Sequence, residues 1–178
     1  MAKKTVTITL YTSEILYDIQ NKTYLTGRSR MTGQNHEEVA HMQANEDEEN
    51  ENQILRSIGN AIAGLRTKLS EYLVDTGTTA TNILIDKEKN LEVSLNMPSN
   101  YNAATKETIA TNLHQHIVNT SVAEWFTITN KTDAADYVAL AASNIEQIRE
   151  ALNKRVRPER TAPKTGTDQE TGTDQETE

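Results

Sequence analysis

Two histidines are the first residues of this chain whose spacing suggests chemistry. They bound the run His36-Glu37-Glu38-Val39-Ala40-His41, which has the residue types of a zinc-protease helix. That motif needs its histidines four residues apart, so that both face one metal ion. Here they are five apart, which separates them by about 140° around a helix. Ala40 stands where the second ligand would be. We therefore predict no metal ion and no cofactor at this motif.

The other two histidines, His114 and His116, are two residues apart in a predicted helix. They point about 200° away from each other and cannot share a ligand. A catalytic histidine needs a nucleophile and an orienting carboxylate nearby. The chain has no cysteine, and none of its serines lies in a nucleophile-elbow motif. We predict that the protein is not an enzyme, and a hydrolase is the weakest functional hypothesis.

Acidic residues crowd one internal segment. Residues 36–51 contain seven acids and no lysine or arginine, including the block Glu46-Asp47-Glu48-Glu49. A calcium loop alternates its oxygen ligands and places a glycine at the turn. The block does neither, so it predicts a solvated negative segment rather than a calcium or magnesium site.

Four side chains remain as candidates for contact with other molecules. Arg28 and Arg30 follow a predicted helix and could bind a phosphate or an acidic partner. Trp125 and Phe126 are the only tryptophan and the only phenylalanine. Such aromatics usually anchor a core, but they also dominate protein interfaces. Both interpretations stay open, and these four residues are the predicted interaction residues.

Composition limits the class of protein further. The chain has 178 residues, a net charge of −8, 35% hydrophobic residues and no cysteine. Its length predicts one domain, and its charge argues against a basic nucleic-acid groove. The absence of cysteine favours a reducing compartment. We find no apolar run of a secretory signal or of a membrane span, which needs about 18 residues, so we expect no membrane partner.

The N-terminal half predicts a strand and two helices. Residues 5–10 alternate strictly between threonine and apolar side chains, as in a half-buried strand. A helix is expected over residues 13–25, with Gly27 placed to end it. Residues 31–50 predict an acidic loop or a solvated helix extension. Apolar residues then recur every three or four positions, which indicates an amphipathic helix over residues 51–74.

The C-terminal half predicts a hairpin, two helices and a tail. Residues 82–86 and 91–95 alternate on either side of a polar turn, so residues 82–96 predict a β-hairpin. A helix is expected over residues 102–119, with a restart at Ser121. Asn130 or Thr132 is expected to cap the last helix, which runs to about Val156 before Pro158 ends it. Residues 159–178 contain a repeated TGTDQE sequence and predict a disordered acidic tail.

The predicted fold is therefore mainly α. Residues 1–158 form one domain, a bundle of three to four helices with a β-hairpin. The N-terminal segment adds a further strand or remains a disordered arm until assembly. A two-stranded hairpin is marginal in water by itself, so it must pack on helices or pair with another strand.

The C-terminal third carries a family resemblance. Residues 116–131, HIVNTSVAEWFTITNK, together with Asp136-Tyr137 and the segment Ala151 to Pro158, resemble proteins of tailed phages and prophages of gut Bacteroidetes. Such proteins look like parts of the head–tail connection region. The order of helices and a small hairpin is also similar to helical connector proteins.

The resemblance implies a virion protein that is assembled in the bacterial cytoplasm. It would be a ring-forming homo-oligomer, a head–tail connector or neck subunit that binds portal, tail or other neck proteins. DNA would be only passing cargo in its channel, which a negative lumen would repel. The alternative hypothesis is a cytoplasmic protein-binding or regulatory module that is encoded on a mobile element.

Overall fold

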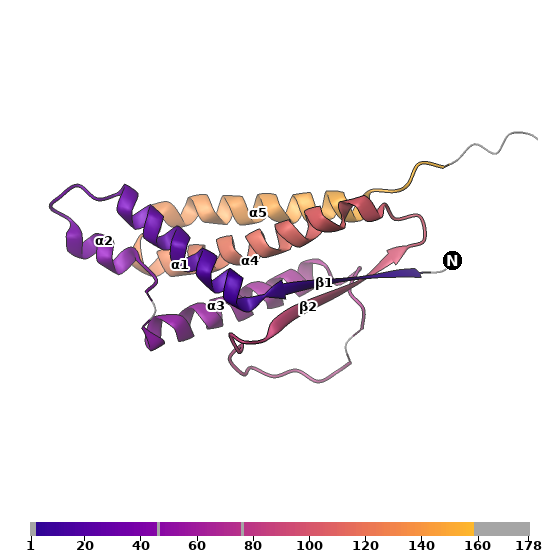
Figure 1. The fold of residues 1–178 in the computed structure, drawn as a ribbon, viewed down its shortest axis with the longest axis horizontal. Helices are drawn as coiled ribbons and strands as arrows, with labels where there is room; N and C mark the ends of the chain where they lie inside the picture. Colours follow the sequence, from indigo (N-terminus) through magenta and orange to yellow (C-terminus); the bar gives the residue numbers. More distant parts are fainter. Residues whose placement is uncertain (1–2, 46, 76, 159–178) are drawn as a thin grey trace, which may run out of the picture.

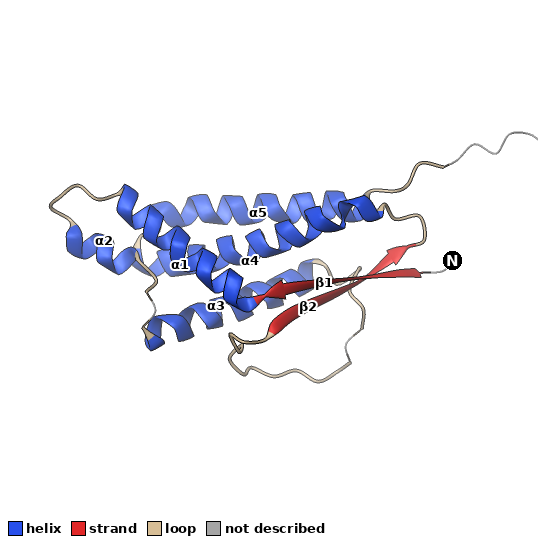
Figure 2. Cartoon of the chain, viewed as in Figure 1, coloured by secondary structure: helices blue, strands red, loops and turns tan. Residues whose placement is uncertain are grey.

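The computed structural model describes residues 3–45, 47–75 and 77–158, and the predicted tail, residues 159–178, lies outside them. The predicted mainly α class is confirmed (Figures 1 and 2). The elements, in chain order, are β1 (Lys3–Tyr11), α1 (Thr12–Ser29), α2 (His36–Met42), α3 (Glu48–Lys68), β2 (Asn90–Pro98), the 3-10 turn η1 (Ala103–Thr105), α4 (Lys106–Thr129) and α5 (Lys131–Asn153).

The N-terminal strand is confirmed, and its partner corrects the predicted hairpin. β1 pairs antiparallel with β2 in an unbroken register from Lys3 opposite Pro98 to Tyr11 opposite Asn90. Ile8 and Leu10 are buried, whereas the alternating threonines of the strand are exposed. Residues 82–86 form no strand. The predicted hairpin was therefore wrong in its first strand, because β1 takes that place and offers β2 a longer ladder.

A second correction concerns the end of α3. The helix stops at Lys68 instead of continuing to residue 74. The chain then turns to the free edge of β2, where Leu73 forms a β-bridge with Leu95. The amide of Val74 donates to the carbonyl of Ser94 at 3.0 Å. Leu73 thus lies at the edge of the sheet and does not extend the apolar stripe of the helix.

Helix α4 is the central element and is continuous over its 24 residues. The predicted break near Ser121 does not occur. α4 packs against α1, α3 and α5 and also contacts β1. It therefore buries residues around most of its circumference, including Ile109, Leu113, Val118 and Val122.

The predicted acidic loop, residues 31–50, is partly helical. It contains α2, which buries Val39 and Met42, and α3 begins within it at Glu48. Gly27 lies inside α1 and does not end it. A Cβ atom at Gly27 would stand 3.2 Å from the carbonyl oxygen of Val39. The glycine therefore permits α2 to lie close against α1.

Helix α5 covers α4 along its length (Figure 1). The predicted apolar stripe is confirmed at most positions, from Ala134 to Leu152. Val138 and Ala142 were predicted on the same stripe but are exposed. The helix ends at Asn153, three residues earlier than expected, because the chain there pairs with the approach to α4. The amide of Val156 donates to the carbonyl of Asn100 at 2.8 Å.

Candidate interaction surface

Trp125, a predicted interaction residue, lies in the core. Its side chain is buried, and its indole N–H donates to the carbonyl of Met42 at 2.9 Å. This bond joins α4 to the end of α2. The residue therefore anchors α2.

Phe126 lies in the core as well. It is fully buried, and its ring packs in a tilted arrangement against Tyr137, with centroids 5.5 Å apart. That contact joins α4 to α5. Of the two interpretations left open for the aromatic pair, the geometry supports core packing, and the prediction of a surface role is corrected.

Arg30, which follows the last residue of α1, bonds to the start of α5. Its Nη2 donates to Oδ1 of Asp133 at 2.5 Å, and its Nε donates to Oδ2 at 3.2 Å. The Asp133 carboxylate is almost fully buried and also accepts from the Asn130 amide. The hydrogen bonds from Arg30 raise the pKa of its guanidinium further. Arg30 therefore fixes α1 to the first turn of α5, which is a structural role.

Arg28 is the one predicted interaction residue that faces outward without such a role. It belongs to a row of exposed side chains on α1 that we call the α1 stripe: Tyr17, Asn21, Tyr24 and Arg28. Their spacing of four, three and four residues places them on one helix face. Tyr17 and Tyr24 are 62% and 41% exposed. The Arg28 guanidinium donates to the Tyr24 hydroxyl at 3.2 Å.

The two tyrosines of the stripe were missed from the sequence. A signal for them was present, because they fall opposite the apolar residues Ile15, Leu16 and Ile19 of the same helix. Tyrosine on the polar face of an amphipathic helix has no core to fill. It is more typical of an interface.

A shallow hollow adjoins the α1 stripe. It has a volume of about 310 Å³ and lies between α1 and the segment that follows α2. Its lining is polar and aromatic, consisting of Tyr17, Gln20, Asn21, Tyr24, Gln43, Ala44 and Asn45. None of these side chains is a metal ligand of the soft type or a nucleophile activated by a base. The hollow offers tyrosine rings and amide groups for contact with another molecule.

The opposite side of α1 is held by a polar network. Lys22 donates from Nζ to the side-chain oxygens of Gln115, at 2.8 Å, and Asn119, at 2.7 Å. The Asn119 amide donates to Asn144 at 2.9 Å, and that residue donates to Asn112 at 3.0 Å. The chain of bonds joins α1, α4 and α5. Burial lowers the pKa of Lys22, although Asp18 opposes the change.

The histidines of α4 both take part in packing. His114 contacts Asp18 of α1 through Nε2 at 2.8 Å. His116 is buried, and its Nδ1 donates to the carbonyl of Ala141 at 2.8 Å. Burial lowers the pKa of His116, so the neutral ring is favoured. The two rings bond to different helices, α1 and α5.

Neither the α2 histidines nor the acids assemble a metal site in the described part of the chain. Among these residues there is no group of three or more histidine, aspartate or glutamate side chains that could hold a metal ion. Glu51 instead forms an ion pair with Lys87 at 2.8 Å. His36 and His41 lie on α2, five residues apart.

Comparisons with known proteins add no relative. No family model, no curated protein and no solved structure matches the chain. Within the described ranges, no helix combines the length and the apolar character that crossing a membrane requires.

Proposed function

We propose that this chain is a non-enzymatic assembly protein of a tailed phage, a head–tail connector or neck subunit that binds its neighbours through the α1 stripe. The observation that carries the proposal is an exposed row of two tyrosines, an asparagine and an arginine on a braced helix. Tyrosine and arginine are the residue types that contribute most at protein interfaces.

The α1 stripe is rigid enough to bind without a large loss of entropy. α1 continues directly from β1, is tied to α4 by Lys22 and Asp18, and is tied to α5 by Arg30. A preorganised helix face loses little conformational freedom when a partner packs on it. Four independent attachments therefore support a binding role for its outer face.

The resemblance of the C-terminal third supplies the biological setting of the proposal. A connector subunit would form a homo-oligomeric ring in the virion, between portal and tail or other neck proteins. The net charge of −8 suits a channel through which DNA passes without binding. The small sheet differs from a connector hairpin, because its strands are far apart in the sequence.

The test is assembly with and without the stripe. The full chain is mixed with the portal and tail proteins encoded beside it, and particle mass is measured by analytical ultracentrifugation and negative-stain microscopy. We expect rings or portal-bound complexes, and we expect Tyr17→Ala combined with Tyr24→Ala to abolish them. Leu140→Ala, which truncates an exposed side chain on α5, is the matched control and should assemble normally.

Two outcomes would contradict the proposal. A chain that stays monomeric with every virion partner would exclude a connector. Normal assembly of the double tyrosine variant would exclude the α1 stripe as the interface. Binding of a nucleic acid or a small regulatory protein, without incorporation into particles, would favour a regulatory module instead.

A further inference from the structure

The outer edge of β1 has no partner strand in the described part of the chain. β1 pairs with β2 along one edge only, over nine consecutive residue pairs without a bulge. Proteins usually protect such edges with charges, prolines, bulges or short strands. Between Thr5 and Tyr11 the strand has none of these devices. Charge is confined to Lys3 and Lys4 at the start of the strand. The regular edge that follows them is a site where another strand can add.

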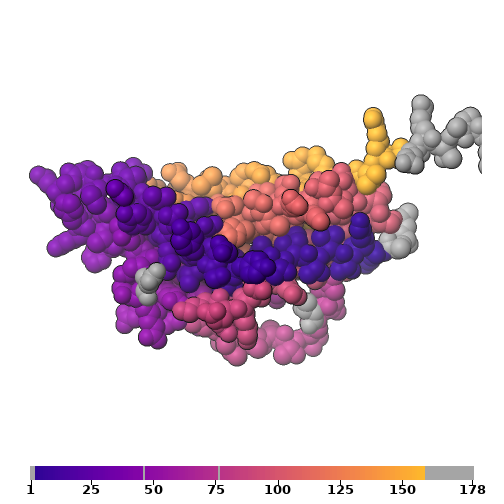
Figure 3. Space-filling model, viewed as in Figure 1, coloured from indigo at the N-terminus to yellow at the C-terminus, as the bar shows by residue number. Residues whose placement is uncertain are grey.

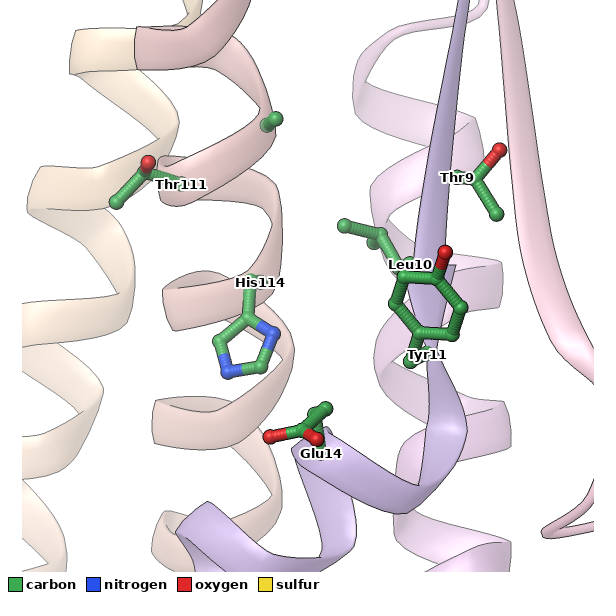
Figure 4. Close-up of a pocket in the computed structure, with 7 residues that line it drawn as sticks. Thr9, Leu10, Tyr11, Glu14, Thr111 and His114 are labelled. Carbon is green, nitrogen blue, oxygen red and sulfur yellow. The ribbon is translucent and has the colours of Figure 1, made fainter.

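The surface beside the C-terminal end of this edge is hollowed. A hollow of about 360 Å³ lies between β1 and α4 (Figure 4). Its lining comes from the end of β1, the start of α1 and one face of α4: Thr9, Leu10, Tyr11, Glu14, Ala110, Thr111 and His114. The Glu14 carboxylate is exposed, and among the described residues it forms no ion pair. In Figure 3 the indigo residues of this segment lie on the molecular surface.

The sequence of β1 is complementary to itself. Thr5-Val6-Thr7-Ile8-Thr9 has the same pattern of threonine and β-branched apolar residues when it is read in either direction from Thr7. In an antiparallel pair centred on Thr7, each threonine would face a threonine. Val6 would face Ile8. Such cross-strand pairs stabilise a sheet.

We propose that β1 pairs antiparallel with β1 of a second copy of this chain, with Thr7 on the twofold axis. The two small sheets become one sheet of four strands, in the order β2–β1–β1–β2. An isologous contact of this kind closes on itself and leaves no strand edge of β1 exposed.

Charge complementarity favours this occupant over an unrelated strand. In the proposed register Lys3 of one copy stands opposite Tyr11 of the other. The Lys3 ammonium group can then lie over the exposed Tyr11 ring. It also comes close to the start of α1, where Glu14 supplies a carboxylate without an ion pair. The same two contacts occur twice, once on each side of the axis.

The contact is separate from the α1 stripe and does not depend on the proposed function. Substitutions in the stripe should leave a β1 dimer intact, and substitutions in β1 should leave the stripe intact. The two proposals can therefore fail independently.

The proposed dimer can be tested by substitutions at Thr7 that place two like charges beside each other on its twofold axis. Thr7 is exposed on the face away from the core, so Thr7→Lys and Thr7→Glu each bring two equal charges together only in the dimer. We expect the wild-type chain to sediment as a dimer and each variant to dissociate at least about tenfold more readily, which corresponds to about 1.4 kcal/mol. Mixing the two variants should restore a dimer, now as a heterodimer. Thr79→Lys and Thr79→Glu, in an exposed loop, are the matched controls.

Hydrogen exchange of the wild-type chain gives a test that needs no substitution. Outward-facing amides of β1 should exchange more slowly as protein concentration rises through the dimerisation range, while loop amides should not change. A wild-type monomer at every concentration would overturn the proposal. A dimer that Thr7→Lys leaves intact would also overturn it, because the contact would then lie on another face.

Discussion

The close approach of α2 to α1 can be tested by giving two glycines the same new methyl group. Gly27 and Gly64 both lie inside helices. Alanine is favoured over glycine in a helix interior by about 1 kcal/mol. At Gly64 a Cβ atom meets nothing within 4 Å, whereas at Gly27 it meets the Val39 carbonyl oxygen at 3.2 Å and the Met42 Cβ at 3.5 Å.

The two substitutions to alanine should therefore change the free energy of unfolding differently: one should raise it, and the other should leave it unchanged or lower it. Gly64→Ala should stabilise the protein by about 0.5–1 kcal/mol. Gly27→Ala receives the same helical gain, but α2 must move away by a few tenths of an ångström, and we expect a net change between about 0 and −1 kcal/mol. Gly27→Leu, which overpacks the contact, should cost about 3 kcal/mol.

Urea unfolding followed by far-UV circular dichroism measures all three variants on one scale. Equal m-values among the variants would show that the same transition is compared. If Gly27→Ala stabilised the protein as much as Gly64→Ala does, α2 would not be packed on α1 as described. The reasoning about this contact would then be wrong.

Three further predictions concern buried polar groups. Trp125→Phe should cost about 1–2 kcal/mol because the Met42 carbonyl loses its donor, and circular dichroism must follow the unfolding because no tryptophan remains. His116 has a lowered pKa in the folded protein, so the free energy of unfolding should fall as pH drops below about 6.5. His116→Gln should reduce the difference between the free energies of unfolding measured with urea at pH 7.5 and at pH 5.5. Asn119→Leu and Asn144→Leu should each cost about 1–3 kcal/mol, and the double variant should cost less than their sum by at least about 0.5 kcal/mol; strict additivity would contradict the network.

The sequence predicted the elements that carry a strong local period. The apolar stripe of α3 and the alternation of β1 each occupy one face, so the pattern reports burial directly. The ends of these elements were less predictable. α3 was expected to continue to residue 74 because Leu69 and Leu73 keep its spacing. In the fold Leu73 instead bonds to the edge of β2, and no local pattern distinguishes these two uses of a leucine.

The pairing of β2 shows why strand partners are harder to predict than strands. Residues 82–86 and β1 carry similar alternating patterns, and the first of them is nearer in the chain. Proximity favours the hairpin because a short loop costs less entropy to close. β1 provides nine paired residues, where the hairpin would have provided about five, and the longer ladder is the one that forms. That balance depends on contacts across the whole chain.

The candidate site was mispredicted for a reason that lies in α4. A helix with a single buried face leaves its large aromatics on a recognisable stripe, but α4 is enclosed by α1, α3 and α5. Its buried set therefore includes Asn112, His116 and Asn119 as well as apolar residues. Trp125 and Phe126 serve this central helix, so the rare aromatic types were taken up by the core. The residues that we propose for contact with a partner, Tyr17 and Tyr24, are of a commoner type, and their position opposite the core of α1 is the signal that marks them.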